Sequence, residues 1–238
     1  MSGVPPQQAN RTTRLHECAL APGVRRAHLR RMMIRRLLQL SLGLFLFGFS
    51  TALMVRAGLG LNPWDIFHQG VADRLGWSIG SVIVATGALL LLLWIPLRER
   101  PGIGTVSNML FVGVAANWSL SVLPGAEGLP LQILFLVGGV VLQGLAAGIY
   151  IGAGLGPGPR DGLMTGLVAR TGWSIRSVRG GIEVTVVAAG WLLGGTVGIG
   201  TLVYAVAIGP LVQIFLPLFT VGKRRGGASA DRLQDCAP

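Results

Sequence analysis

Two aspartates occupy matching places in two similar stretches of the chain. Asp65 lies in "GLGLNPWDIF", and Asp161 lies 96 positions later in "GLGPGPRDGL". Within a membrane, a pair of semi-buried carboxylates could bind a proton, a metal cation or a cationic substrate. Each carboxylate could instead accept hydrogen bonds from free amides in the first turn of a helix, which is a structural role. The residue types alone leave both interpretations open.

The glycine turns before the two aspartates suggest a different chemistry. Such turns leave backbone N–H groups free at a helix N-terminus, and this arrangement suits an anion. The charge of a bound solute therefore stays open. Candidate site residues come from both stretches and from one later helix: Gly58, Gly60, Asn62, Pro63, Asp65, Gly154, Gly156, Pro159, Asp161 and Glu183.

Other polar residues within apolar surroundings have structural explanations as well. Glu183 follows Arg179 by one helical turn, so an i,i+4 ion pair and a role in a pathway are both open. His68 has Met164 at the matching position and is interpreted as a helix-face residue. We expect the remaining polar residues at membrane depth to form hydrogen bonds between helices. These residues are Asn108, Asn117 and Gln143.

Several enzyme signatures are missing from the sequence. The motifs GxxxxGK[ST] and HExxH do not occur, and Lys223 is the sole lysine. Cys18 and Cys236 lie alone in the polar ends, without the spacing of metal ligands. The sequence therefore predicts no enzymatic activity, no metal and no cofactor.

Composition indicates an integral membrane protein. Hydrophobic residues make up 51% of the 238 residues and charged residues only 12%, compared with about 25% charged in soluble domains. The net charge of +11 does not indicate a nucleic-acid-binding protein, because the basic residues gather at the ends of the apolar runs. Such residues set membrane topology and attract anionic lipid head groups.

Six apolar runs approach the ~20 residues that cross a bilayer. They fall at about 34–56, 80–97, 102–123, 130–153, 178–195 and 197–219. Between the first two runs, Asn62 as N-cap, Pro63 and the stop at Gly76 predict a helix of about 20 Å. This helix and its later copy are too short to span, so we expect re-entrant or interfacial elements.

The basic residues also predict the topology. The cluster between 25 and 36 places the N-terminus in the cytoplasm, and six spans return the C-terminus to the same side. We therefore expect a basic, disordered tail at 1–33, a transmembrane domain at 34–219 and a basic polar tail at 220–238.

The chain contains an internal duplication. The segment "GWSI" at 76–79 recurs at 172–175, and "GIGT" at 102–105 recurs at 198–201. Each half, about 34–124 and 130–219, has three spans, so the second half enters the membrane from the opposite side. The predicted fold is an all-α polytopic membrane protein of about six transmembrane helices in two inverted three-helix repeats, each with a short re-entrant or interfacial helix. Transporters commonly have this architecture.

The stretches "GLGLNPWDIFHQGVADRLGWSIG", "WIPLRERPGIGTVSNMLFVG" and "GLGPGPRDGLM" resemble the YczE-type group of bacterial membrane proteins, which is often grouped with YyaS and YitT. The resemblance covers about residues 35 to 220. It implies a small polytopic protein of the bacterial cytoplasmic membrane, and it supplies no substrate. The second copy departs from the first at Arg160, where the first has Trp64.

The leading functional hypothesis is a secondary transporter or channel for a small solute or ion, with a pathway lined by residues 58–68 and 154–165. The alternative is a non-transporting accessory or scaffold subunit. A solute-capturing subunit would lie between the two, and an intramembrane enzyme comes third. Expected partners are anionic lipid head groups, the solute, and other membrane proteins or further copies of the chain, but no nucleic acid.

Overall fold

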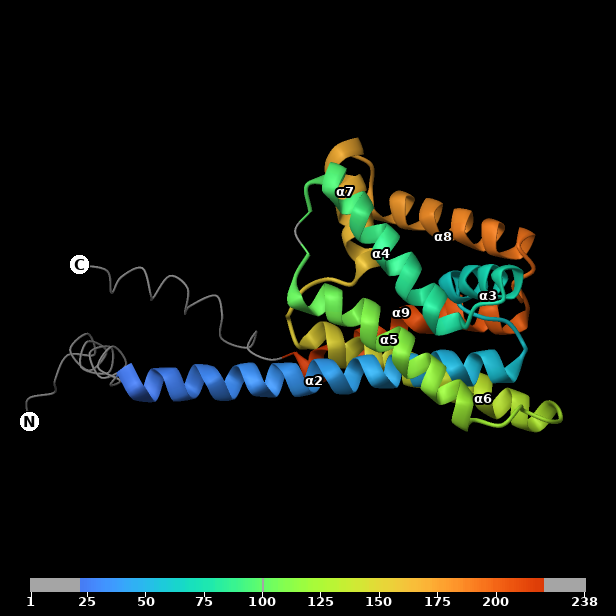
Figure 1. Cartoon of the computed structure of the whole chain (residues 1–238), viewed down its shortest axis with the longest axis horizontal. Helices are drawn as coiled ribbons and strands as arrows, with labels where there is room; N and C mark the ends of the chain where they lie inside the picture. Colours follow the sequence, from blue (N-terminus) through green and yellow to red (C-terminus); the bar gives the residue numbers. More distant parts are fainter. Residues whose placement is uncertain (1–21, 100, 221–238) are drawn as a thin grey trace, which may run out of the picture. The chain divides into compact units, whose positions relative to one another are not determined.

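A computed structural model describes residues 22–99 and 101–220. The helix contacts and the two hollows described below lie in the larger of its two compact units, Leu38–Val221. The described residues form eight helices and no strand (Figure 1). The helices are α2 (Pro22–Ala57), α3 (Pro63–Leu75), α4 (Ile79–Leu97), α5 (Ile103–Val122), α6 (Leu129–Gly152), α7 (Pro159–Thr171), α8 (Ile175–Leu192) and α9 (Ile199–Phe219).

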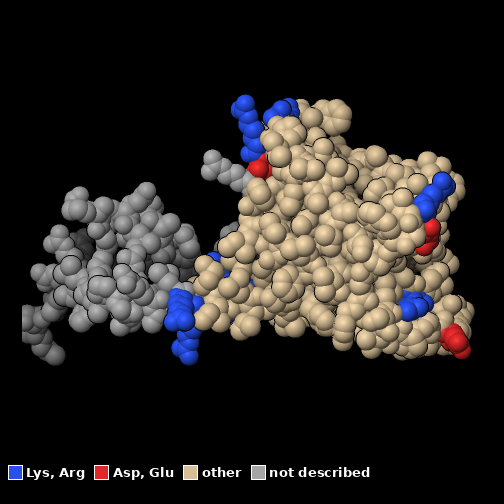
Figure 2. All heavy atoms as spheres, in the orientation of Figure 1, with Lys and Arg blue, Asp and Glu red and all other residues tan. Residues whose placement is uncertain are grey.

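Five of the described helices are long and apolar enough to cross a membrane, namely α2, α4, α5, α6 and α9. Helix α8 is not among them, and its 18 residues include Arg176, Arg179 and Glu183. On the face seen in Figure 2, the charged side chains of the described residues lie at the margins and leave a broad uncharged surface. These features are those of a polytopic membrane protein.

The two short helices have the boundaries that local signals predict. Helix α3 begins after Asn62, whose Oδ1 accepts a hydrogen bond from the backbone N–H of Asp65 at 2.9 Å. It ends at Gly76, with a left-handed φ of 67°. Helix α7 begins with the Gly158 backbone N–H donating to Asp161 Oδ2 at 3.3 Å, and it also ends at a left-handed glycine. The predicted helix at Pro63–Leu75 is confirmed.

Helix α2 is longer than its apolar run. The run predicts a start near residue 34, whereas the helix begins at Pro22. The preceding segment is rich in Arg, Leu, Met and Ala, which have high helix propensity without being uniformly apolar. Part of the predicted tail, residues 22–33, is therefore helical. Residues 1–21 and 221–238, which hold both cysteines and Lys223, lie outside the described residues.

Glycines let α2 and α6 approach closely at two points. A Cβ built on Gly43 of α2 would lie 2.8 Å from the backbone nitrogen of Tyr150. A Cβ built on Gly139 of α6 would lie 2.7 Å from Cγ of Met54. Because Gly43 meets the end of α6 and Gly139 meets the end of α2, the two helices run antiparallel. Small residues permit this close packing in membranes.

Two further helix pairs use a glycine in the same way. A Cβ on Gly48 of α2 would lie 2.6 Å from the Ala115 side chain of α5. A Cβ on Gly144 of α6 would lie 2.6 Å from the Leu211 side chain of α9. The pairs α2–α5 and α6–α9 therefore have similar contacts.

The short helices pack on two of the longer ones, α3 on α8 and α7 on α4. Gly190 of α8 lies against α3, where an added Cβ would be 2.8 Å from the carbonyl carbon of Ile66. Gly162 of α7 lies against the indole of Trp94, which leaves no room for a Cβ. Gly190 thus meets the backbone of α3 and Gly162 meets the Trp94 side chain, and each glycine allows the short helix to pack closely on its neighbour.

The glycine turns that precede the short helices dock on the starts of other helices. The Leu59 carbonyl accepts a hydrogen bond from the Gly200 backbone N–H at 2.8 Å, which joins the first turn to α9. The Leu155 carbonyl accepts from the Gly104 N–H at 3.0 Å, which joins the second turn to α5. At Gly60, φ is +117°, and an added Cβ would lie 2.8 Å from the backbone nitrogen of Gly198, which precedes α9. These turns therefore require glycine for structural reasons.

Candidate functional site

A cavity of about 400 Å³ lies where the starts of α3 and α7 meet the longer helices. This volume is within the range of small-molecule sites, roughly 300–1,000 Å³. Much of its lining is apolar, but several polar and charged side chains face it. They are Asn62, His68, Thr86, Asn108, Tyr150, Arg160, Asp161, Arg179, Glu183, Tyr204 and Gln213.

Arg160 and Trp64 contact each other in this cavity. The guanidinium carbon of Arg160 lies 4.9 Å from the centroid of the Trp64 ring, which is a cation–π arrangement. The five N–H donors of a guanidinium point outward within its plane, so stacking of its face on a ring does not block them. Within the described part of the chain, no carboxylate forms an ion pair with Arg160. The cavity thus contains a cation whose donors are available to a ligand.

The two acids of the cavity are partly engaged already. Asp161 accepts the hydrogen bond from Gly158 that begins α7. Glu183 accepts from Arg179 Nε at 3.0 Å, so the predicted i,i+4 pair forms while both of its residues line the cavity. Glu183 therefore forms the predicted ion pair and also lines the cavity.

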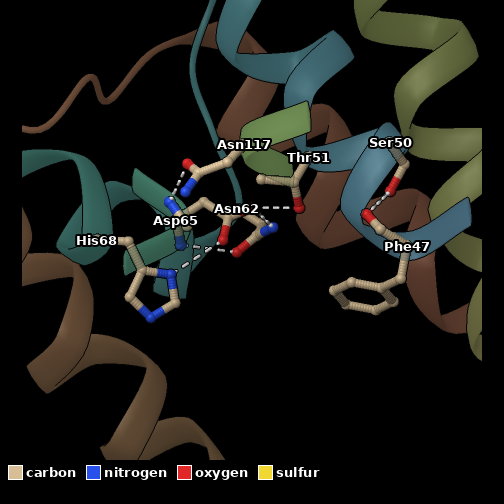
Figure 3. Close-up of polar contacts among 8 residues, drawn as sticks. Phe47, Ser50, Thr51, Asn62, Asp65, His68 and Asn117 are labelled. Atoms are coloured by element: carbon tan, nitrogen blue, oxygen red, sulfur yellow. Dashed lines mark hydrogen bonds and ion pairs between the residues drawn. The ribbon is translucent and has the colours of Figure 1, made fainter. Parts of the chain in front are cut away.

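Asp65, in contrast, is buried in a hydrogen-bond network and does not line the cavity (Figure 3). Its Oδ2 accepts from Thr51 Oγ1 at 3.0 Å and from Asn62 Nδ2 at 2.6 Å. Its Oδ1 lies 3.2 Å from His68 Nδ1. Asn62 and His68 do line the cavity, so Asp65 positions two groups that a ligand would meet. The two matched aspartates therefore have different surroundings.

The candidate site residues divide between the cavity and the framework around it. The cavity is lined by Asn62, Pro63, Pro159, Asp161 and Glu183. The residues that hold the framework are Gly58, Gly60, Asp65, Gly154 and Gly156.

Sequence reasoning did not assign individual roles to several cavity residues that carry polar or aromatic groups. Trp64 and Arg160 fall within the predicted pathway segments 58–68 and 154–165, but individually they were noted only as the position at which the two copies differ. Tyr150 and Tyr204 were not considered, although they are the two tyrosines of the chain. The sequence signal that could have identified these two tyrosines is a rare hydroxyl group within an apolar span.

The polar residues at membrane depth have different environments. Asn117 of α5 donates to Ser78 Oγ and accepts from the Gly80 backbone N–H, both at 2.9 Å, so it joins α5 to α4 as expected. Gln143 is fully buried, and neither of its side-chain polar atoms has a hydrogen-bond partner among the described residues. It lies one turn before Ala147, on the face of α6 that lines the cavity.

No group of three or more His, Cys, Asp or Glu side chains that could hold a metal ion occurs among residues 22–99 and 101–220. The polar and charged groups that line the cavity can form hydrogen bonds and ion pairs.

These features define the class: a polytopic, α-helical membrane protein with a polar cavity between two short helices. Residues 34–217 match the model of a "Family of unknown function (DUF6198)". The chain belongs to this family.

Comparison with curated proteins supports the same assignment. The chain is 36% identical over 177 residues to "Uncharacterized membrane protein YczE" of Bacillus subtilis, which covers 74% of this chain and 82% of the relative. It is 36% identical over 173 residues to an uncharacterized protein of Haemophilus influenzae, covering 73% and 79%. It is 24% identical to "Uncharacterized protein YyaS" of Bacillus subtilis, covering 78% and 96%. The predicted YczE-type relationship is confirmed. No solved structure shows a significant match.

Proposed function

We propose that this protein is a secondary transporter or channel that moves a small solute or ion across the bacterial cytoplasmic membrane without catalysing a covalent reaction. In this proposal α8 is the sixth span, and both chain ends are cytoplasmic. The observation that carries the proposal is the charged cavity between the starts of α3 and α7, because charged groups at membrane depth mark solute pathways. The charges of α8 fit this proposal, since Arg179 and Glu183 face the cavity.

Exchanged contacts support an inverted repeat. Gly43 and Gly139 are 96 positions apart, and so are their partners Met54 and Tyr150. Gly43 contacts Tyr150, while Gly139 contacts Met54. Such a reversal of partners is expected when a pseudo-two-fold axis relates two antiparallel helices.

The short helices follow the same exchange. Ile66 and Gly162 occupy matching positions, as do Trp94 and Gly190, and the contacts join Ile66 to Gly190 and Gly162 to Trp94. Positions 64 and 160 also match, and a residue that contacts its own counterpart must lie near the axis. The Arg160–Trp64 contact therefore supports an axis that passes through the cavity.

One departure from this symmetry supports alternating access. A Cβ on Gly113 of α5 would lie 2.5 Å from the Gly80 carbonyl oxygen of α4, so this pair of helices is closed. The matching Gly209 of α9 lines the cavity, and a Cβ added there would meet open space. The first half is thus closed at this contact, and the second half is open. Such a difference between two inverted repeats is expected in one state of an alternating-access cycle.

A single cysteine at Gly209 tests the proposal. In a variant without Cys18 and Cys236, Gly209→Cys would be treated with a membrane-impermeant thiol reagent in intact cells and in inverted vesicles. We expect reaction from both sides, because the cavity of a transporter or channel opens to each in turn or at once. Gly180→Cys is the matched control, since Gly180 also has open space around it but does not line the cavity. Reaction of Gly209→Cys from one side only would favour a scaffold and reject transport.

A further inference from the structure

An apolar groove of about 490 Å³ lies beside the cavity, between α3, α4, α7 and α8. None of the residues that line it is charged. They are Trp64, Phe67, Thr86, Leu89, Leu90, Leu163, Leu167, Thr171, Trp173, Ser177, Val178, Gly181, Ile182, Thr185, Val186 and Ala189. The groove is thus suited to a hydrocarbon chain rather than to a polar solute.

The groove and the cavity share a wall. Trp64, Thr86, Leu90 and Ile182 line both hollows. The groove also reaches the molecular surface, since Leu89 is 57% exposed and Trp173 is 66% exposed. Where the surface around the groove lies within the hydrocarbon core of a bilayer, it contacts lipid chains. An apolar path therefore leads from the outer surface to the polar cavity.

The charged end of this path is Arg160, which stacks on the shared residue Trp64. The two acids of the cavity already accept hydrogen bonds within the protein, Asp161 from Gly158 and Glu183 from Arg179. A guanidinium with available donors binds the oxygens of a carboxylate or a phosphate in a bidentate manner. The junction of the two hollows therefore favours an oxyanion.

We propose that the substrate is a single-chain amphiphile that carries an oxyanion head group. The head group binds Arg160 in the cavity, and the hydrocarbon chain lies in the groove between α4 and α8. This inference rests on the proposed function, because it names the class of solute that the same cavity would transport. Entry through the groove would let such a molecule reach the site directly from the bilayer.

Binding of radiolabelled dodecanoate to the full-length protein in lipid nanodiscs tests this proposal, with empty nanodiscs as the background. We expect dodecyl phosphate to displace dodecanoate, and dodecylamine, dodecanol and butyrate to require at least tenfold higher concentrations. Arg160→Gln should weaken dodecanoate binding at least tenfold. Displacement by dodecylamine as effective as that by dodecyl phosphate, or binding unaffected by Arg160→Gln, would overturn the assignment of the head group.

Two neighbouring glycines provide a matched test of the groove. Gly181 lines the groove and Gly180 lines neither hollow, yet an added Cβ meets open space at both positions. Gly181→Trp should weaken dodecanoate binding at least fivefold, whereas Gly180→Trp should leave it unchanged. Equal effects of the two variants, or butyrate binding as tight as dodecanoate binding, would overturn the hydrocarbon site.

The failure of this inference is distinguishable from the failure of transport. If dodecanoate does not bind but Gly209→Cys reacts from both sides of the membrane, the protein has a pathway for another solute. If dodecanoate binds as expected but Gly209→Cys reacts from one side only, the cavity is a lipid site in a non-transporting protein.

Discussion

Substitution of Gly162 by alanine should destabilise the contact that positions Arg160. Gly162 lies in the first turn of α7, directly against the indole of Trp94 on α4. The same indole donates from Nε1 to the carbonyl of Pro159 at 3.0 Å, and so fixes the start of α7. An added methyl group cannot fit unless the ring or the helix moves.

The expected size of the effect comes from three contributions. Overpacking a close contact costs about 1–3 kcal/mol. Loss of the Trp94–Pro159 hydrogen bond adds about 0.5–1.5 kcal/mol. Alanine gains about 1 kcal/mol over glycine in helix propensity. The free energy of unfolding should therefore fall by about 0.5–3.5 kcal/mol.

Unfolding of the full-length protein in mixed micelles, followed by circular dichroism, measures this change. Gly180→Ala is the matched control, because a methyl group there meets open space and should be neutral or stabilising. Trp94→Leu in the Gly162→Ala background should recover part of the loss by making room for the methyl group. If Gly162→Ala is as stable as Gly180→Ala, the close packing of α7 on α4 is refuted.

The same unfolding assay checks three further expectations. Asp65→Ala should cost about 2–5 kcal/mol, because it leaves the buried donors of its network without an acceptor, while Asp161→Ala should cost about 1 kcal/mol or less. Equal losses would contradict their different surroundings. Gly60→Ala should cost more than Gly58→Ala, by about 1 kcal/mol or more, because both have positive φ but only Gly60 also meets a neighbouring backbone. Arg179→Gln should change stability by less than about 1 kcal/mol, because its ion pair with Glu183 is exposed; a larger loss would show that the pair holds α8 in place.

Local sequence signals predicted the local structure well. Helix α3 follows from Asn62, Pro63 and Gly76, because capping and helix termination depend on residues that are adjacent in the chain. The start of α2 was placed too late, since hydropathy reports the apolar run and not the helix. Helix α8 is not among the five long, apolar helices because its 18 residues include Arg176, Arg179 and Glu183, of which Arg179 and Glu183 line the cavity.

The composition of the cavity depends on contacts between distant parts of the chain. Tyr150, Arg160 and Tyr204 come from three helices, and no local spacing brings them together. The two aspartates illustrate the same limit, because similar stretches give a buried network at Asp65 and a cavity carboxylate at Asp161. Their surroundings differ through Thr51 and Asn62, which contact the first aspartate only.

Cysteine accessibility at two matching positions tests the central claim of inverted repeats most directly. Single cysteines at Ser78 and Ser174, the N-caps of α4 and α8, would be introduced after replacement of Cys18 and Cys236. Intact cells would then be labelled with a membrane-impermeant thiol reagent. The proposed topology predicts labelling at position 78 and not at 174, with both positions labelled after permeabilisation. Labelling of both positions or of neither in intact cells, in a protein confirmed to be inserted, would contradict the inverted repeat and the transport mechanism based on it.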